Sequence, residues 1–158
     1  DVSRILKSAE ILLHTGELVR WDAGQLQFSY RYSRLHDVQG IVTEAVFELR
    51  EGDRQTITAE TLALKERRLR TQPLQLPCAG SVFRNPDRHY AARLIEEAGL
   101  KGYRVGGAEV STLHANFIIN TGRGTAEDVR TLMEHIQRVI FEKYGIRLVP
   151  EVLEVGER

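Results

Sequence analysis

One short stretch, residues 77–86, gathers side chains that could do chemistry: it reads Pro-Cys-Ala-Gly-Ser-Val-Phe-Arg-Asn-Pro. Gly80 can adopt backbone angles that other residues avoid, and it lets a ligand approach the main chain. Ser81 adds a hydroxyl that both donates and accepts, while Arg84 and Asn85 add a cation and an amide. We interpret the stretch as a rigid ledge that carries the polar groups of a binding site.

A purely structural interpretation of the same stretch stays open on the residues alone. Val82 and Phe83 are typical of a short buried strand. Gly80 and Pro86 are typical of the turns on either side of such a strand. In that case the hydroxyl of Ser81 is incidental.

Two other segments hold side chains of interest. Residues 26–33 combine three aromatics with Arg31, and they read as a helical turn whose apolar side chains plug the core: Leu26, Phe28 and Tyr32. Arg31 needs a partner if it is buried among them. Glu151 follows a proline in apolar surroundings, where a buried carboxylate must be paired or protonated; a solvated glutamate near the end of the chain is the alternative.

Two weaker signals could indicate phosphate binding. The loop at residues 101–108 combines two cations with glycines, and backbone N–H groups in such loops can cradle a phosphate. Its spacing matches no P-loop or dinucleotide fingerprint. A basic run at Arg67, Arg68 and Arg70 could also meet a phosphate, although cations at a solvated helix C-terminus are the commoner explanation.

The pattern of apolar residues predicts the elements that position these groups. Strands are expected at 9–14, 17–21, 41–49, 82–83, 115–120 and 146–149. Helices are expected from a cap at Thr56 or Thr58 to about residue 70, over 90–98 and over 126–144. Thr125 caps the last helix, with Asp128 in a capping-box arrangement. Prolines at 73 and 77 make a stiff connection, which we interpret as a domain boundary.

Composition excludes several classes of protein. The 158 residues carry 22 acidic and 22 basic side chains, so no net field attracts nucleic acid or an anionic membrane. The lone Cys78 excludes an internal disulfide and any multi-cysteine metal site. No apolar run approaches the ~20 residues of a membrane helix, and no signal peptide is visible. The chain starts at Asp1 without an initiator methionine, and we expect a fragment.

Three patterns, taken in order, resemble the UDP-N-acetylenolpyruvoylglucosamine reductases, a family of flavoenzymes in peptidoglycan precursor synthesis. They are Phe28-x-Tyr30-Arg31-x-Ser33, then residues 80–86, then Pro150-Glu151-Val152. Intervening residues match as well, among them 99–102, 106–111 and 114–117. The resemblance covers nearly the whole chain, but the family's N-terminal flavin-binding half, with its glycine-rich loops, has no counterpart here.

The resemblance implies an α+β chain in three parts. Residues 1–73 are similar to the C-terminal part of the second FAD-binding lobe. Residues 74–148 are similar to a small α+β substrate-binding domain, and residues 149–158 to the segment that returns to the FAD side. Most of the residues that bind the cofactor would then lie outside this chain, and those within it are unknown.

The resemblance also assigns roles to residues. Arg31, Ser81 and Glu151 match the catalytic residues of a reaction in which NADPH reduces FAD, and the flavin then passes a hydride to UDP-N-acetylglucosamine enolpyruvate. Arg31 would stabilise charge on the substrate carboxylate with help from Glu151, and Ser81 would protonate the α-carbon. Because a carbanion-like carbon is a strong base, the position of the serine matters more than its acidity.

Substrate contacts are implied as well. Tyr30 and Asn85 match residues that line the family's site, and four residues are candidates for the UDP phosphates and sugar: Arg84, Lys101, His114 and Asn116. A structural role at a strand end explains His114 equally well. We expect a cytoplasmic monomer with no metal, nucleic-acid or membrane partner. The alternative function is a UDP-sugar-binding module without redox chemistry.

Overall fold

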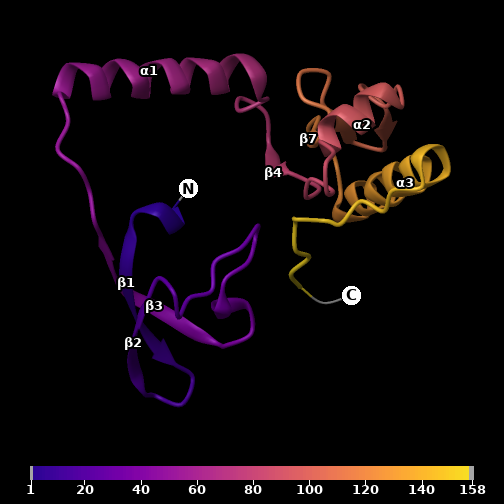
Figure 1. Cartoon of the computed structure of the whole chain (residues 1–158). Coiled ribbons are helices and arrows are strands. Elements are labelled where there is room, and N and C mark those ends of the chain that lie inside the picture. Colours follow the sequence, from indigo (N-terminus) through magenta and orange to yellow (C-terminus); the bar gives the residue numbers. More distant parts are fainter. Residues whose placement is uncertain (1, 157–158) are drawn as a thin grey trace. The chain divides into compact units, whose positions relative to one another are not determined.

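The computed structural model of the chain describes residues 2–156 (Figure 1). The chain divides into two compact units, Asp1–Thr56 and Ile57–Arg158. Helices and antiparallel sheets build these units, so the predicted α+β class is confirmed. The domain boundary predicted at residue 73 stays a prediction.

The first unit is built on a three-stranded antiparallel sheet of order β2-β1-β3. β1 (Leu6–Leu13) and β2 (Leu18–Asp22) form a hairpin, and β3 (Gly40–Phe47) pairs with the other edge of β1. These strands confirm the first three predicted ones to within a few residues. Two short 3-10 helices, Val2–Arg4 and Arg34–His36, flank them. Apolar side chains form a small core: Leu6, Ala9, Ile11, Trp21 and Leu26.

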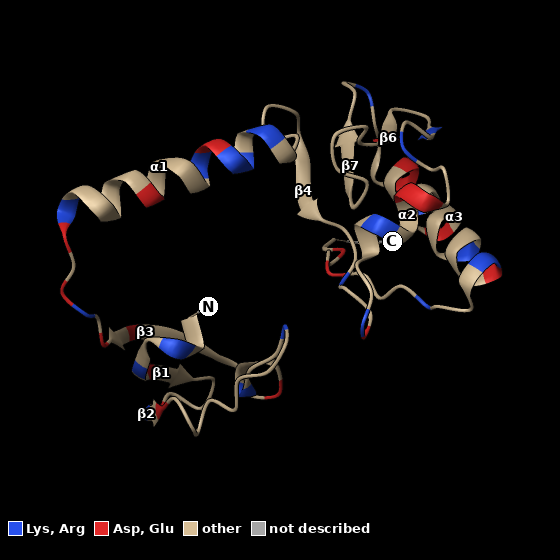
Figure 2. Cartoon of the chain, turned by 45° about the horizontal axis from the view of Figure 1, so that its top comes forward, with Lys and Arg blue, Asp and Glu red and all other residues tan. Residues whose placement is uncertain are grey.

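The first helix, α1 (Arg54–Thr71), begins earlier than the sequence predicts. The carboxylate of Asp53 accepts the backbone N–H of Thr56 at 2.8 Å and its hydroxyl at 2.9 Å. An aspartate just ahead of a helix satisfies one of the open N–H groups of the first turn. The prediction of a cap at Thr56 or Thr58 is therefore wrong. No residue of α1 is buried, and cations gather near its C-terminus (Figure 2).

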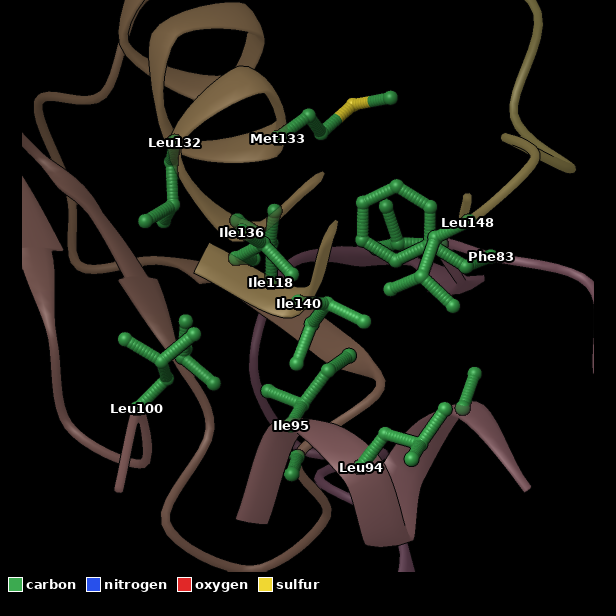
Figure 3. Close-up of a cluster of buried hydrophobic side chains, with 14 of the residues drawn as sticks. Phe83, Leu94, Ile95, Leu100, Ile118, Leu132, Met133, Ile136, Ile140 and Leu148 are labelled. Carbon is green, nitrogen blue, oxygen red and sulfur yellow. The ribbon is translucent and has the colours of Figure 1, made fainter. Parts of the chain in front are cut away.

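The second unit contains a four-stranded antiparallel sheet of order β4-β7-β6-β5. Its strands are β4 (Cys78–Ser81), β5 (Arg104–Val105), β6 (Ala108–Val110) and β7 (Phe117–Asn120). Two helices, α2 (Ala91–Glu97) and α3 (Ala126–Tyr144), supply most of the remaining core. Figure 3 shows how their side chains meet those of the sheet in one cluster, which includes Phe83, Leu94, Ile95, Ile118, Leu132, Ile136 and Ile140.

The longest helix, α3, confirms the prediction at both ends. The hydroxyl of Thr125 accepts the N–H of Asp128 at 3.1 Å, and the carboxylate of Asp128 accepts the N–H of Thr125 at 2.9 Å. Gly145 ends the helix in the left-handed conformation, with φ of +69°. Both signals are local in sequence, which explains why they could be predicted.

Two of the predicted strands are not strands. Val82 and Phe83 are buried as predicted, with 3% and 1% exposed, but the ladder ends at Ser81. Residues 146–149 form no strand either, and only an isolated bridge joins Phe83 to Pro150. Neither segment forms a regular strand, because their backbone groups hydrogen-bond to each other and to Asn116.

Candidate functional site

Ser81 ends β4, the edge strand of the four-stranded sheet, and it is half-buried there. It pairs with Phe117 of β7, and the register shifts between Cys78 and Ser81. Gly80 has a φ of +85°, and an added Cβ would meet no atom within 4 Å. The glycine therefore takes up the bend directly ahead of the serine, as its position in the sequence predicts.

Glu151 is brought to the same edge by backbone hydrogen bonds. On one side of the Phe83–Pro150 bridge, the N–H of Arg84 donates to the carbonyl of Val149 at 2.9 Å; on the other, the N–H of Glu151 donates to the carbonyl of Val82 at 2.8 Å. Val82 directly follows Ser81. The fold therefore places the segments of two predicted catalytic residues side by side, and we call this contact the Ser81–Glu151 junction.

Asn116 holds the junction from the side of β7. Its side-chain amide bonds to both backbone polar groups of Phe83, and its own carbonyl accepts the N–H of Val82 at 2.9 Å. Asn116 is only 5% exposed. Its amide is thus used within the protein, although the sequence suggested a substrate contact. A polar amide at the start of an apolar strand is the signal that could have revealed this role.

Arg84 carries a feature that points to an anion. Its Nε is buried and has no hydrogen-bond partner among the described residues. A buried donor without a partner is costly, most of all on a charged group. An anionic ligand would remove that cost, because guanidinium groups bind phosphate and carboxylate oxygens well. The next residue, Asn85, accepts the N–H of Ala91 at 3.0 Å through its Oδ1, and so steadies the start of α2.

Lys101 and His114 lie on turns of the same unit. The Nζ of Lys101 pairs with Oε1 of Glu96 at 2.6 Å. The Nδ1 of His114 accepts the N–H of Asn116 at 3.3 Å, and its ring meets Phe117 edge-on with centroids 4.7 Å apart. Burial lowers the pKa of His114, and the charge of Lys101 adds to the effect. A histidine held this way is neutral at pH 7 and can still donate through Nε2.

Tyr30 and Arg31 belong to the first unit. Arg31 has a φ of +57°, rare for a side chain of its size, and its Cζ lies 5.0 Å from the centre of the Tyr30 ring. Both line a pocket of about 620 Å³, together with Val2, Ser3, Phe28, Ser29, Tyr32, Ser33 and His36. Its lining is more apolar than polar, and its aromatic rings, hydroxyls and one cation suit an aromatic or anionic ligand.

The predicted core plug of the first unit is only partly present. Leu26 is buried, with 2% exposed, whereas Phe28 is 37% exposed. Tyr32 is half-buried and its hydroxyl donates to the carboxylate of Asp37. Of the three residues expected in the core, the segment therefore contributes only Leu26, and Phe28 and Tyr32 line the pocket.

The glycine loop at 101–108 folds as a β-hairpin of β5 and β6. The N–H of Gly107 donates to the Asp128 carboxylate at 3.2 Å, and its carbonyl accepts the N–H of Thr121 at 2.9 Å. A side chain at Gly107 would collide with the backbone of Gly124. Hydrogen bonds from Thr125 and Gly107 lower the pKa of Asp128. These contacts within the protein explain why glycines are needed at both positions of the pair.

Metal and membrane sites find no support in the described part of the chain. Within residues 2–156, no three histidine, cysteine, aspartate or glutamate side chains gather closely enough to hold a metal ion. None of the helices described there is long and apolar enough to cross a membrane.

The fold and the junction together define an α+β domain whose polar groups gather where an edge strand meets the C-terminal segment. A family model described as UDP-N-acetylenolpyruvoylglucosamine reductase, C-terminal domain, matches residues 72–155. A protein of that name from Bacillus licheniformis is 46% identical, over 100% of this chain and 86% of its own length. The chain therefore belongs to the UDP-N-acetylenolpyruvoylglucosamine reductase family.

Other similar proteins are longer than this chain. A UDP-N-acetylenolpyruvoylglucosamine reductase from Bacillus pumilus is 47% identical over 99% of the chain, which spans 52% of that relative. The crystal structure of UDP-N-acetylenolpyruvylglucosamine reductase from Thermus caldophilus superposes with a TM-score of 0.79 at 36% identity, covering 92% of this chain and 52% of that one. The chain thus spans about half the length of most curated relatives compared.

Proposed function

We propose that this chain forms part of a reductase that uses NADPH and FAD to convert UDP-N-acetylglucosamine enolpyruvate to UDP-N-acetylmuramate, a step in peptidoglycan precursor synthesis. The Ser81–Glu151 junction is the observation that carries the proposal, because it brings the segments that carry Ser81 and Glu151 side by side. Family membership supports it. Residues 1–73 would face the flavin, 74–148 would bind substrate, and 149–158 would return to the flavin side of a cytoplasmic enzyme.

Ser81 would give a proton to the α-carbon of the substrate. Reduction adds a hydride to the β-carbon of the enol ether, and the electron pair of the double bond then rests on the α-carbon and its carboxylate. That carbon takes the hydroxyl proton of Ser81, and water would return a proton to the serine. The half-buried hydroxyl follows a glycine with open space beside it, so a substrate can come close.

Glu151 and Arg31 would stabilise the charge that develops on the substrate. The planar fork of Arg31 suits a carboxylate, and Arg31 lines a pocket among hydroxyls and aromatic rings. A glutamate next to an anionic carboxylate works best as a neutral donor, and Glu151 is half-buried at the junction. Tyr30 would line the same site as Arg31.

Binding of the UDP group would fall mainly to the second unit. The buried Nε of Arg84 has no hydrogen-bond partner among the described residues, and a phosphate oxygen would supply one. Lys101 and neutral His114 would add a cation and a donor to the phosphates or sugar, and Asn85 would contact the substrate while it steadies α2. Asn116 would act indirectly, by holding the segment that carries Ser81 and Arg84.

The residues described offer only part of a site for FAD. The aromatic and hydroxyl groups around Arg31 suit a ring system, but the Gly106–Gly107 pair, the best candidate for a pyrophosphate cradle, is occupied by Asp128. FAD would thus be held mainly by protein outside residues 2–156. When bound, it would supply the hydride that NADPH provides, while this chain supplies the proton and the anion-binding groups.

The test separates the two halves of the reaction in a flavin-containing reductase that carries this chain. Ser81→Ala should leave the reduction of FAD by NADPH unchanged and slow its reoxidation by the enolpyruvyl substrate by roughly 10²–10⁴-fold, the usual contribution of a general acid. Ser8→Ala, at a half-buried serine on β1, is the matched control. Reoxidation at the unmodified rate in Ser81→Ala would rule out the proton-donor role.

A non-redox UDP-sugar-binding module is the second candidate, since Arg84 and Lys101 lie in the unit that the family model matches. Calorimetric titration of the chain with UDP-N-acetylglucosamine tests binding directly. Two results would favour the module over the reductase: the chain binds UDP-N-acetylglucosamine, and the flavin-containing protein that carries it is inactive.

A further inference from the structure

Two contacts help to attach the C-terminal segment that carries Glu151 to the rest of the second unit. The first is the Ser81–Glu151 junction, where the N–H of Glu151 donates to the carbonyl of Val82. The second lies three residues further on, where the side chain of Glu154 meets Arg130 of α3.

Arg130 binds Glu154 through two of its nitrogens. Its Nη2 lies 3.1 Å from Oε2 of Glu154, and its Nε lies 3.3 Å from Oε2 and 3.4 Å from Oε1. The third nitrogen, Nη1, pairs with Oε2 of Glu127 at 2.5 Å, one turn earlier on α3. Glu127 therefore holds the guanidinium in place, and the fork of Arg130 faces the tail.

Packing alone does not hold the segment between these two attachments. Val152 packs against the core, but Leu153 is 87% exposed. Beneath the tail lies a pocket of about 560 Å³, bounded by β4, β7 and α3 and lined in part by Val152, Leu153, Glu154 and Arg130. Arg130 and Glu154 both line this pocket, and their ion pair ties the tail to α3.

We propose that Arg130 is a positioning residue for Glu151. By holding Glu154, it keeps the segment extended along α3 and restricts the directions that the Glu151 side chain can take. The effect on catalysis rests on the proposed function, whereas the attachment itself does not. Because an exposed pair contributes little free energy, the expected effects are about two- to fivefold.

Amide hydrogen exchange in the full chain, followed by NMR, tests the attachment. Arg130→Gln and Glu154→Gln should each speed exchange of the Glu151 amide by about two- to fivefold, and the double variant should do no more than either single one. Arg138→Gln, on the same helix, is the control and should leave this amide unchanged. Unchanged exchange in Arg130→Gln, or an equal effect of Arg138→Gln, would overturn the proposal.

A charge exchange and a kinetic measurement test the consequence for catalysis. Arg130→Glu combined with Glu154→Arg should restore slow hydrogen exchange of the Glu151 amide, because the introduced arginine would meet two carboxylates. In the flavin-containing reductase, Arg130→Gln should lower kcat by about two- to fivefold with KM for the UDP-sugar unchanged, and the charge exchange should recover kcat. A rise in KM alone would mean that Arg130 contacts substrate, and would refute positioning. If the unmodified reductase is inactive, that result counts against the proposed function, while the amide hydrogen-exchange data still test the attachment.

Discussion

The side-chain amide of Asn116 pairs with both backbone polar groups of Phe83. Its Oδ1 accepts the N–H of Phe83 at 3.0 Å, and its Nδ2 donates to the carbonyl at 2.8 Å. Phe83 is 1% exposed, so water cannot take the place of the amide. This one side chain therefore replaces a strand partner where the chain leaves β4, and it supports the Ser81–Glu151 junction.

Asn116→Ala should lower the free energy of unfolding of the second unit by about 2–4 kcal/mol, because it leaves a buried N–H and a buried carbonyl unpaired. Urea unfolding followed by far-UV circular dichroism measures this loss. Thr112→Ala, at an exposed position of the same unit, is the control and should change stability by less than about 0.5 kcal/mol. If Asn116→Ala lowers stability by no more than this control, the junction is stable without the amide.

Gly80 and Gly99 form a matched pair for testing the bend before Ser81. Their φ angles are +85° and +77°, and at neither would a Cβ meet an atom within 4 Å. Gly80→Ala and Gly99→Ala should therefore each cost about 1–2 kcal/mol, from backbone strain alone. Only Gly80→Ala should slow flavin reoxidation by substrate. Equal kinetic effects of the two changes would show that the bend at Gly80 has no special role in placing Ser81.

Substitutions at Glu151 distinguish its neutral from its charged form. If Glu151 works as a neutral donor, Glu151→Gln keeps a donor and should retain clearly more activity than Glu151→Ala, which should lose roughly 10²–10³-fold in kcat. Steady-state kinetics of the flavin-containing reductase provides both values, with Glu142→Gln on α3 as the control. A glutamine variant as impaired as the alanine variant would indicate that the carboxylate is the working form.

The stability of the second unit should depend on pH through His114. Burial lowers the pKa of His114 below its ordinary value of 6.5, so the unfolded chain binds more protons than the folded one near that pH. Its contribution is therefore most favourable above pH 6.5 and declines as the pH falls through 6.5 towards the folded value. NMR titration of the ring should give a midpoint below 6.5, and His114→Asn should flatten the pH dependence. A midpoint at or above 6.5 would contradict this account.

Several features of the fold could be predicted because their causes are local. The apolar face of α3 and its cap at Thr125 lie within a few residues of each other, and the structure has both. The left-handed glycines at 80 and 145 have the backbone angles that their positions indicate. Family membership could likewise be predicted, because the order of the motifs is a property of the sequence.

The incorrect predictions concern one helix cap and two strands, and the two strands share a cause. The cap of α1 is Asp53, and the segments around 82 and 148 are not strands. Propensity favours a strand at these two segments, but a strand also needs a neighbour to complete its ladder. Here the neighbours are a side-chain amide and an isolated bridge.

The sequence by itself determined which residues were available for chemistry, where the helices and most strands form, and to which family the chain belongs. Only the tertiary structure decided that the N–H of Glu151 meets the carbonyl of Val82 and that Arg130 holds Glu154. Hydrogen bonds and ion pairs between residues far apart in the chain produce no periodic pattern in the sequence. They depend on where packing of the core brings two segments together, and that is settled by the whole fold.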